Sequence, residues 1–180
     1  YGIIDPLIVV TPTWYVENDC EDDLDVLTYT FKEELRNYLM PYIETRYSTY
    51  AGILNKDDSL DYSKEFIESR DQRAFAGLSR GAFTTIHSAL CESLDYFSYF
   101  GAFSGVDADT EYLNETLLRP EFDQYKINYL YVTSGTFDFL LPSQLQQYSN
   151  MLNVAGLKLK LNYNTSFDVF PMRYHSMGSW

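Results

Sequence analysis

The sequence has few basic residues and no long apolar run, and both shortages exclude classes of protein. It contains 13 lysines and arginines against 26 aspartates and glutamates, which gives a formal charge of −13. A surface this negative repels nucleic-acid phosphates and anionic lipid headgroups, so we expect neither nucleic acid nor a membrane as a partner. The apolar run at residues 3–10 is too short to span a bilayer and is broken by Asp5 and Pro6.

Cysteine and targeting signals are also scarce. The two cysteines, Cys20 and Cys91, cannot form a disulfide framework, and a metal site would need further ligands. One disulfide and two free thiols are both compatible with the sequence. The chain opens at Tyr1 without a charged leader or signal peptide and stops at Trp180 inside a segment with functional character. We therefore expect a fragment of a longer protein.

Aromatic residues, in contrast, are abundant. The chain of 180 residues has 17 Tyr, 12 Phe and 2 Trp, and 46% of its residues are hydrophobic. This composition excludes disorder of the whole chain and supplies one hydrophobic core. We expect a single domain over residues 1–180.

Short apolar runs alternate with helical patterns along the chain. Strands are predicted at residues 7–10, 73–78, 96–104, 127–133 and 157–163. Helices are predicted at residues 27–47, with a kink at Pro41, and at 81–92, 111–118 and 142–155. Strands separated by helices indicate an α/β fold with a mostly parallel central sheet flanked by helices.

The strongest chemical signal is a G-x-S-x-G motif at the second predicted strand-to-helix junction. It reads Gly77-Leu78-Ser79-Arg80-Gly81. In a nucleophile elbow the serine lies on a sharp turn between a strand and a helix. Side chains at positions 77 and 81 are expected to collide with the neighbouring strand or helix, which would explain both glycines. The alternative is that Ser79 is only a helix cap.

The helix after the serine has a chemical role in this interpretation. Its N-terminus would place the Arg80 amide and the positive end of the helix dipole where an oxyanion develops.

A nucleophilic serine needs a base, and the chain has only two histidines. His87 follows Ser79 by eight residues in the same predicted helix, about 12 Å away along the helix axis. It is too distant and is expected to be a surface or core residue. His175 lies in a loop-like segment after the last predicted strand and can fold back over the sheet edge. We therefore predict His175 as the base.

The carboxylate that orients the base should follow a strand later than the serine. Asp138 comes directly after the predicted strand 127–133 and is the preferred candidate. Asp107, Asp109 and Asp168 remain alternatives. The carboxylate would hold the imidazole tautomer and stabilise the imidazolium formed during attack.

Several blocks together resemble a known family. In chain order they are residues 6–13 (PLIVVTPT), 34–50, 73–79 (RAFAGLS), 99–105 (YFGAFSG), 135–138 and 175–180. These blocks are similar to the feruloyl and acetyl-xylan esterases of carbohydrate esterase family 1, which are esterase D-like α/β-hydrolases. The resemblance covers nearly the whole chain.

The resemblance implies a truncated α/β-hydrolase fold and cofactor-free ester hydrolysis. By position, Ser79 matches the nucleophile, Asp138 the acid, His175 the base and the Arg80 backbone amide one oxyanion donor. The family usually has methionine where Arg80 stands. Its earlier strands and second oxyanion donor would precede Tyr1, and its last helix would follow Trp180.

The function expected from these signals is a serine esterase that removes feruloyl or acetyl groups from plant cell-wall polysaccharide such as xylan. The family implies secretion and possible flanking carbohydrate-active modules. Trp14 and Trp180 are candidates to line the acyl pocket, and core packing is an equal alternative for each. Two other functions remain open: the same fold acting on another ester, a thioester or a transferase acceptor, and a catalytically silent carbohydrate-binding relative.

Overall fold

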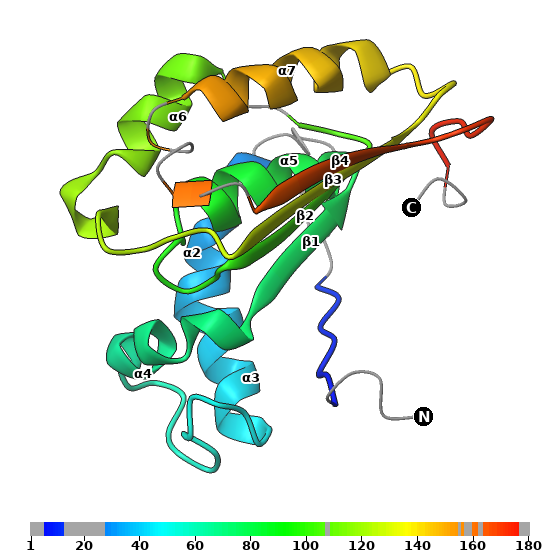
Figure 1. Cartoon of the computed structure of the whole chain (residues 1–180). Helices are drawn as coiled ribbons and strands as arrows, with labels where there is room; N and C mark the ends of the chain where they lie inside the picture. Colours follow the sequence, from blue (N-terminus) through cyan, green and yellow to red (C-terminus); the bar gives the residue numbers. More distant parts are fainter. Residues whose placement is uncertain are drawn as a thin grey trace.

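The described part of the chain is built around a parallel β-sheet. The computed structural model describes residues 6–12, 28–106, 109–154, 156, 160–161 and 164–176. Its four strands are β1 (Ala74–Leu78), β2 (Tyr99–Phe103), β3 (Tyr129–Gly135) and β4 (Thr165–Phe170). They pair in the order β1-β2-β3-β4, and every pair is parallel (Figure 1). The carboxyl ends of all four strands therefore meet at one edge of the sheet.

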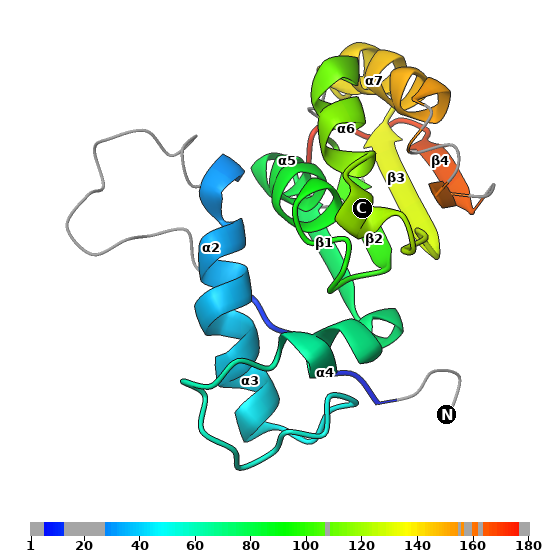
Figure 2. The same ribbon diagram turned by 90° about the vertical axis from the view of Figure 1, so that its left-hand side faces the viewer.

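Helices precede the first strand and connect each strand to the next. The helices are α2 (Lys32–Glu34), η1 (Leu35–Leu39), α3 (Met40–Arg46), α4 (Ser63–Glu68), η2 (Arg70–Gln72), α5 (Arg80–Thr84), η3 (Thr85–Cys91), α6 (Thr110–Leu117), η4 (Pro120–Phe122) and α7 (Leu141–Asn153). Figures 1 and 2 show α6 and α7 over the β3 and β4 side of the sheet, whereas α2 and α3 run past the β1 side.

The core lies between the sheet and α5, η3 and α6. Side chains alternate across β2 and β3, so that Phe100 and Leu130 are buried while Tyr99 and Tyr129 stay partly exposed on the other face. The buried Ile86 and Leu90 of η3 belong to the same cluster as Phe100 and Leu130. This burial fixes the register of the strands and, with it, the positions at which they end.

The helix predicted at residues 27–47 is present, and Pro41 is accommodated by a change of helix type in the preceding turn. Residues 32–46 are helical throughout, and Pro41 stands in the first turn of α3. The preceding five residues form the wide helical turn η1. Proline has no amide hydrogen to give to the preceding turn, and a π-type turn accommodates this inside a continuous helix.

Two predicted strands are wrong. Residues 7–10 have no regular structure and are largely exposed, with Val9 78% exposed, and no strand of the described chain pairs with them. Their apolar pattern favours burial in a strand, but a strand also needs a hydrogen-bonding neighbour. In the predicted range 157–163, the described residues Lys160 and Leu161 are helical, and the strand follows later as β4.

Candidate active site

Ser79 lies on a strained turn between β1 and α5. Its φ is 52° and its ψ is −114°, which is an unusual conformation for a residue with a side chain. The Ser79 amide donates to the Phe103 carbonyl of the adjacent strand at 2.8 Å, and its own carbonyl accepts from Ala82 at 2.9 Å. These bonds on both sides hold the strained geometry, as expected for a nucleophile elbow.

Gly77 is required by this turn, whereas Gly81 is not. A Cβ at position 77 would lie 2.0 Å from the Gly81 carbonyl oxygen, because the helix turns back over the end of the strand. A Cβ at position 81 would meet nothing within 4 Å. The steric argument made from the motif is thus correct for Gly77 and wrong for Gly81.

We expect Gly77→Ala to destabilise the protein strongly and Gly81→Ala to be tolerated. Overpacking costs about 1–3 kcal/mol when side chains can move, and here the obstacle is backbone. Alanine at position 81 should instead stabilise the helix by about 0.5–1 kcal/mol. Urea unfolding of both variants checks this pair, and equal midpoints for the two would contradict the steric argument.

The described structure brings Ser79, His175 and Asp138 together. His175 Nε2 is 3.0 Å from Ser79 Oγ, and its Nδ1 is 3.1 Å from both Asp138 carboxylate oxygens. The Asp138 side chain is fully buried, and the His175 side chain is 22% exposed. A neutral His175 that donates from Nδ1 to the carboxylate has a free lone pair on Nε2 for the serine proton.

The Asp138 carboxylate is held by three donors. The Leu140 amide donates to Oδ1 at 2.9 Å, and the Ser104 hydroxyl and His175 also hydrogen-bond to the carboxylate. Burial alone would raise the pKa of Asp138, but these hydrogen bonds outweigh it and keep the pKa below its ordinary value. Asp138 is therefore an anion at neutral pH.

Ser104 is a site residue that the sequence reasoning did not assign. It follows β2 directly, is fully buried and has a φ of 52°. Its amide donates to the Thr133 carbonyl at 2.8 Å, which fixes it beside the end of β3. The signal in the sequence is the Ser-Gly pair at the end of a predicted strand, at the edge where the other polar candidates gather.

The loop that carries His175 is fastened to the loop that carries Asp138. The Phe137 amide donates to the Arg173 carbonyl at 2.8 Å, and the Met172 amide donates to Thr136 Oγ1 at 2.7 Å. A Cβ at Gly135 would lie 2.3 Å from the Arg173 carbonyl oxygen, so the two backbones touch where glycine permits it. Asp138 and His175 are thus carried by two loops that are bonded to each other at the ends of β3 and β4.

The other carboxylate candidates have different positions. Asp109 caps α6 by accepting a hydrogen bond from the Tyr112 amide at 2.7 Å. Asp168 lies within β4, where it hydrogen-bonds to Tyr131. Asp107 lies outside the described residues, as do Trp14 and Trp180.

His87 and Cys91 both lie in η3, away from the serine hydroxyl. The His87 ring packs between Tyr29 and Tyr112, with centroid distances of 4.6 and 4.7 Å. Cys91 is a buried free thiol, and burial raises its pKa to about 12. A thiol with this pKa is not a nucleophile at neutral pH.

Arg80 is the first residue of α5. Its amide therefore belongs to the first turn of the helix, where amide groups have no carbonyl partner within the helix itself. The helix continues through η3 to Cys91, so that its dipole points at the turn that carries Ser79.

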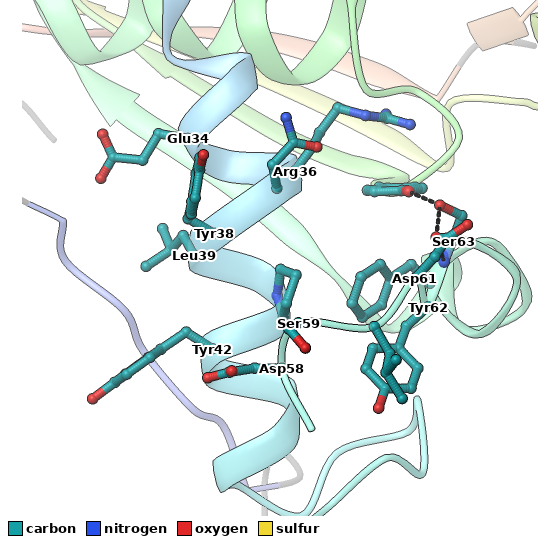
Figure 3. Close-up of a pocket in the computed structure, with 15 residues that line it drawn as sticks. Glu34, Arg36, Tyr38, Leu39, Tyr42, Asp58, Ser59, Asp61, Tyr62 and Ser63 are labelled. Carbon is teal, nitrogen blue, oxygen red and sulfur yellow. Dashed lines mark hydrogen bonds between the residues drawn. The ribbon is translucent and has the colours of Figure 1, made fainter. Parts of the chain in front are cut away.

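A hollow of the described chain lies apart from the Ser79 cluster. It has a volume of about 760 Å³ and is lined by the helix at residues 34–42 and by residues 58–63, which face each other in Figure 3. Asp58 pairs with Arg46 at 2.6 Å, and Asp61 accepts hydrogen bonds from Ser63. No residue of the Ser79 cluster lines this hollow.

Within the described ranges, no group of three or more His, Cys, Asp and Glu side chains is placed to hold a metal ion. No helix in the same ranges is both long and apolar enough to cross a membrane.

The sequence is similar to part of a known protein, but it matches no family model. Over 104 residues, or 58% of this chain, the sequence is 35% identical to the endo-1,4-beta-xylanase Y of Acetivibrio thermocellus, of which it covers 8%.

Two solved structures have the same arrangement of elements. One is a serine-to-alanine mutant of the feruloyl esterase module from Clostridium thermocellum in complex with sinapinate, with a TM-score of 0.68 and 22% identity. The other, named FAE, has a TM-score of 0.67 and 22% identity. Each match covers 84% of this chain and 54% of the solved one, so the chain spans about half the length of these structures. The chain therefore has a truncated α/β-hydrolase fold, similar to that of a feruloyl esterase module, and its sequence is similar to part of a xylanase.

Proposed function

We propose that this chain is part of a serine esterase that hydrolyses acyl esters of plant cell-wall polysaccharide. The observation that carries the proposal is the continuous hydrogen-bonded series from Ser79 through His175 to Asp138, with contacts of 3.0 and 3.1 Å. A serine on a strained turn, a histidine with one nitrogen on each neighbour and a buried carboxylate are the parts that acyl transfer requires.

The first step is attack on the ester carbonyl. His175 Nε2 takes the proton of Ser79 Oγ as the oxygen bonds to the carbonyl carbon, and Asp138 stabilises the imidazolium that results. The Arg80 amide is the proposed donor to the oxyanion of the tetrahedral intermediate. Loss of one such donor typically costs about 10² to 10³ in rate.

The following steps release first the alcohol and then the acid. The intermediate collapses, His175 gives its proton to the leaving alcohol oxygen, and an acyl-serine remains. Water then enters, loses a proton to His175 and attacks the acyl carbon, and Ser79 recovers its proton as the acid departs. The cycle consumes one water and needs no cofactor.

The substrate class is proposed from the likenesses. A similar solved module binds sinapinate, an aromatic acid, and a similar sequence lies within a xylanase. Both support a feruloyl or acetyl ester of a xylan-type polysaccharide as the substrate. On the same basis we propose that residues 1–180 belong to one esterase domain of an extracellular protein with further carbohydrate-active modules.

Labelling with a serine-reactive fluorophosphonate tests the proposal. We expect one adduct per chain, mapped to Ser79 by peptide mass, because only this serine contacts a base that is oriented by a carboxylate among the described residues. The Ser79→Ala variant is the control and should remain unlabelled. A chain that is folded by circular dichroism but gives no Ser79 adduct would contradict the proposal and favour a silent binding module.

A further inference from the structure

Three aromatic side chains beside the proposed active site are exposed. Phe137 is 54% exposed, Phe139 74% and Tyr174 65%. We name these three residues the aromatic ledge. Among the described phenylalanines, only Phe137, Phe139 and Phe170 are exposed, and Phe170 is the least exposed of the three at 38%. Clustered exposed apolar side chains mark binding sites.

One member of the ledge, Phe139, lies directly against His175. The Phe139 ring packs on the His175 ring with a centroid distance of 4.8 Å. Phe137 lies two residues before Phe139, and Tyr174 lies directly before His175. The rings of Phe137 and Tyr174 pack on each other with a centroid distance of 5.2 Å and an interplanar angle of 34°. The two ring pairs therefore lie on the same two loops, close together in the chain.

Backbone hydrogen bonds hold the two loops that carry the ledge. The Phe137 amide donates to the Arg173 carbonyl, and the Asp138 amide donates to the Gly135 carbonyl at 3.1 Å. The Leu140 amide, next to Phe139, donates to the Asp138 carboxylate. A surface that is fixed before the ligand arrives loses little conformational entropy on binding.

The mechanism decides which half of the ester this surface contacts. His175 Nε2 must reach the oxygen of the leaving alcohol, because it returns the serine proton to that atom. The alcohol half of the substrate therefore lies on the His175 side of Ser79. The acyl half lies on the side of the proposed oxyanion donor, the Arg80 amide.

We infer that the aromatic ledge is the subsite for the sugar that carries the ester, and not the acyl pocket. This inference rests on the proposed function. A pyranose or furanose presents apolar C–H faces that pack on aromatic rings, and Tyr174 adds a hydroxyl that can bond to a sugar hydroxyl. The ledge therefore selects the alcohol half of the ester.

Two esters with the same acyl group test the inference. Methyl ferulate and a feruloylated xylo-oligosaccharide differ only in the alcohol. We expect Phe137→Ala and Tyr174→Ala to lower kcat/KM about 10-fold on the oligosaccharide ester, mainly through KM, and to change methyl ferulate hydrolysis less than about 2-fold. Phe139→Ala should show the same preference plus a loss on both esters, since it also supports the His175 ring.

The control is Tyr50→Ala, which removes a 73% exposed aromatic beyond α3 and should alter neither activity. Equal losses on both esters for Phe137→Ala and Tyr174→Ala, or no loss on either, would overturn the inference while the proposed function stands. A wild-type protein that hydrolyses neither ester and is unlabelled at Ser79 would overturn both.

Discussion

Replacing Ser79 with alanine should reduce kcat for ester hydrolysis by about 10⁶-fold. The hydroxyl oxygen is the proposed nucleophile, and no described side chain occupies an equivalent place against His175 Nε2. The measurement is the initial rate on methyl ferulate and on an acetylated xylan, with substrate above KM. Fold should be retained, because the deleted atom is a single oxygen on a turn held by backbone bonds.

A serine remote from the site provides the control for that experiment. Ser59 is exposed and hydrogen-bonds only within its own turn, to Asp57. Ser59→Ala should keep full activity and the same thermal midpoint. Hydrolysis by Ser79→Ala at more than about 1% of the wild-type rate would assign the chemistry to another group.

Asp138→Asn should lower kcat by about 10⁴-fold. An asparagine in this place can turn its amide nitrogen toward His175 Nδ1, and the imidazole then carries its proton on Nε2. That nitrogen can no longer accept the serine proton. The substitution keeps the volume of the side chain, so the loss should appear in kcat at neutral pH while circular dichroism stays unchanged.

Two other aspartates are matched controls for this variant. Asp109→Asn should be neutral, because asparagine caps helices about as well as aspartate. Asp168→Asn alters a hydrogen bond to Tyr131 within the sheet and should change activity less than about 3-fold. If Asp168→Asn were the inactive variant and Asp138→Asn the active one, the proposed assignment would be wrong.

Comparison with Asp138→Asn should also reveal how the stability of the fold depends on pH. The pKa of Asp138 is lowered in the folded protein, so its carboxylate stabilises the fold above the pKa of the unfolded chain, about 3.9 for aspartate. This contribution is lost as the pH falls through the lower folded-state pKa. The thermal midpoints of wild type and Asp138→Asn should therefore differ most at neutral pH and converge below about pH 4.

Local sequence signals predicted much of the sheet and the elbow. The strand at residues 73–78 and the helix after it are recognisable because apolar residues, two glycines and a helical pattern lie within one short segment. Asp138 is preferred from the sequence because it directly follows a predicted strand, with Asp107, Asp109 and Asp168 as alternatives. The proximity of Ser79, Asp138 and His175 is observed, and their catalytic roles stay predictions.

The wrong predictions and the unassigned Ser104 concern segments whose structure depends on residues far away in the sequence. Residues 7–10 have the composition of a strand, but composition does not reveal whether an edge is there to pair with. The last strand lies at residues 165–170 and not at 157–163, because pairing with β3 decides its position. Ser104 was not assigned, since its importance comes only from the carboxylate on the neighbouring strand.

The four parallel strands each deliver one member of the hydrogen-bonded series at the same edge. Ser79 follows β1, Ser104 follows β2, Asp138 follows β3, and His175 follows β4. Neighbouring strands are about 4.8 Å apart, so the series spans the full width of the sheet. A change in the sheet twist would lengthen several of its bonds at once. The proposed activity would therefore depend on the geometry of all four strands, and not only on the strand that carries the serine.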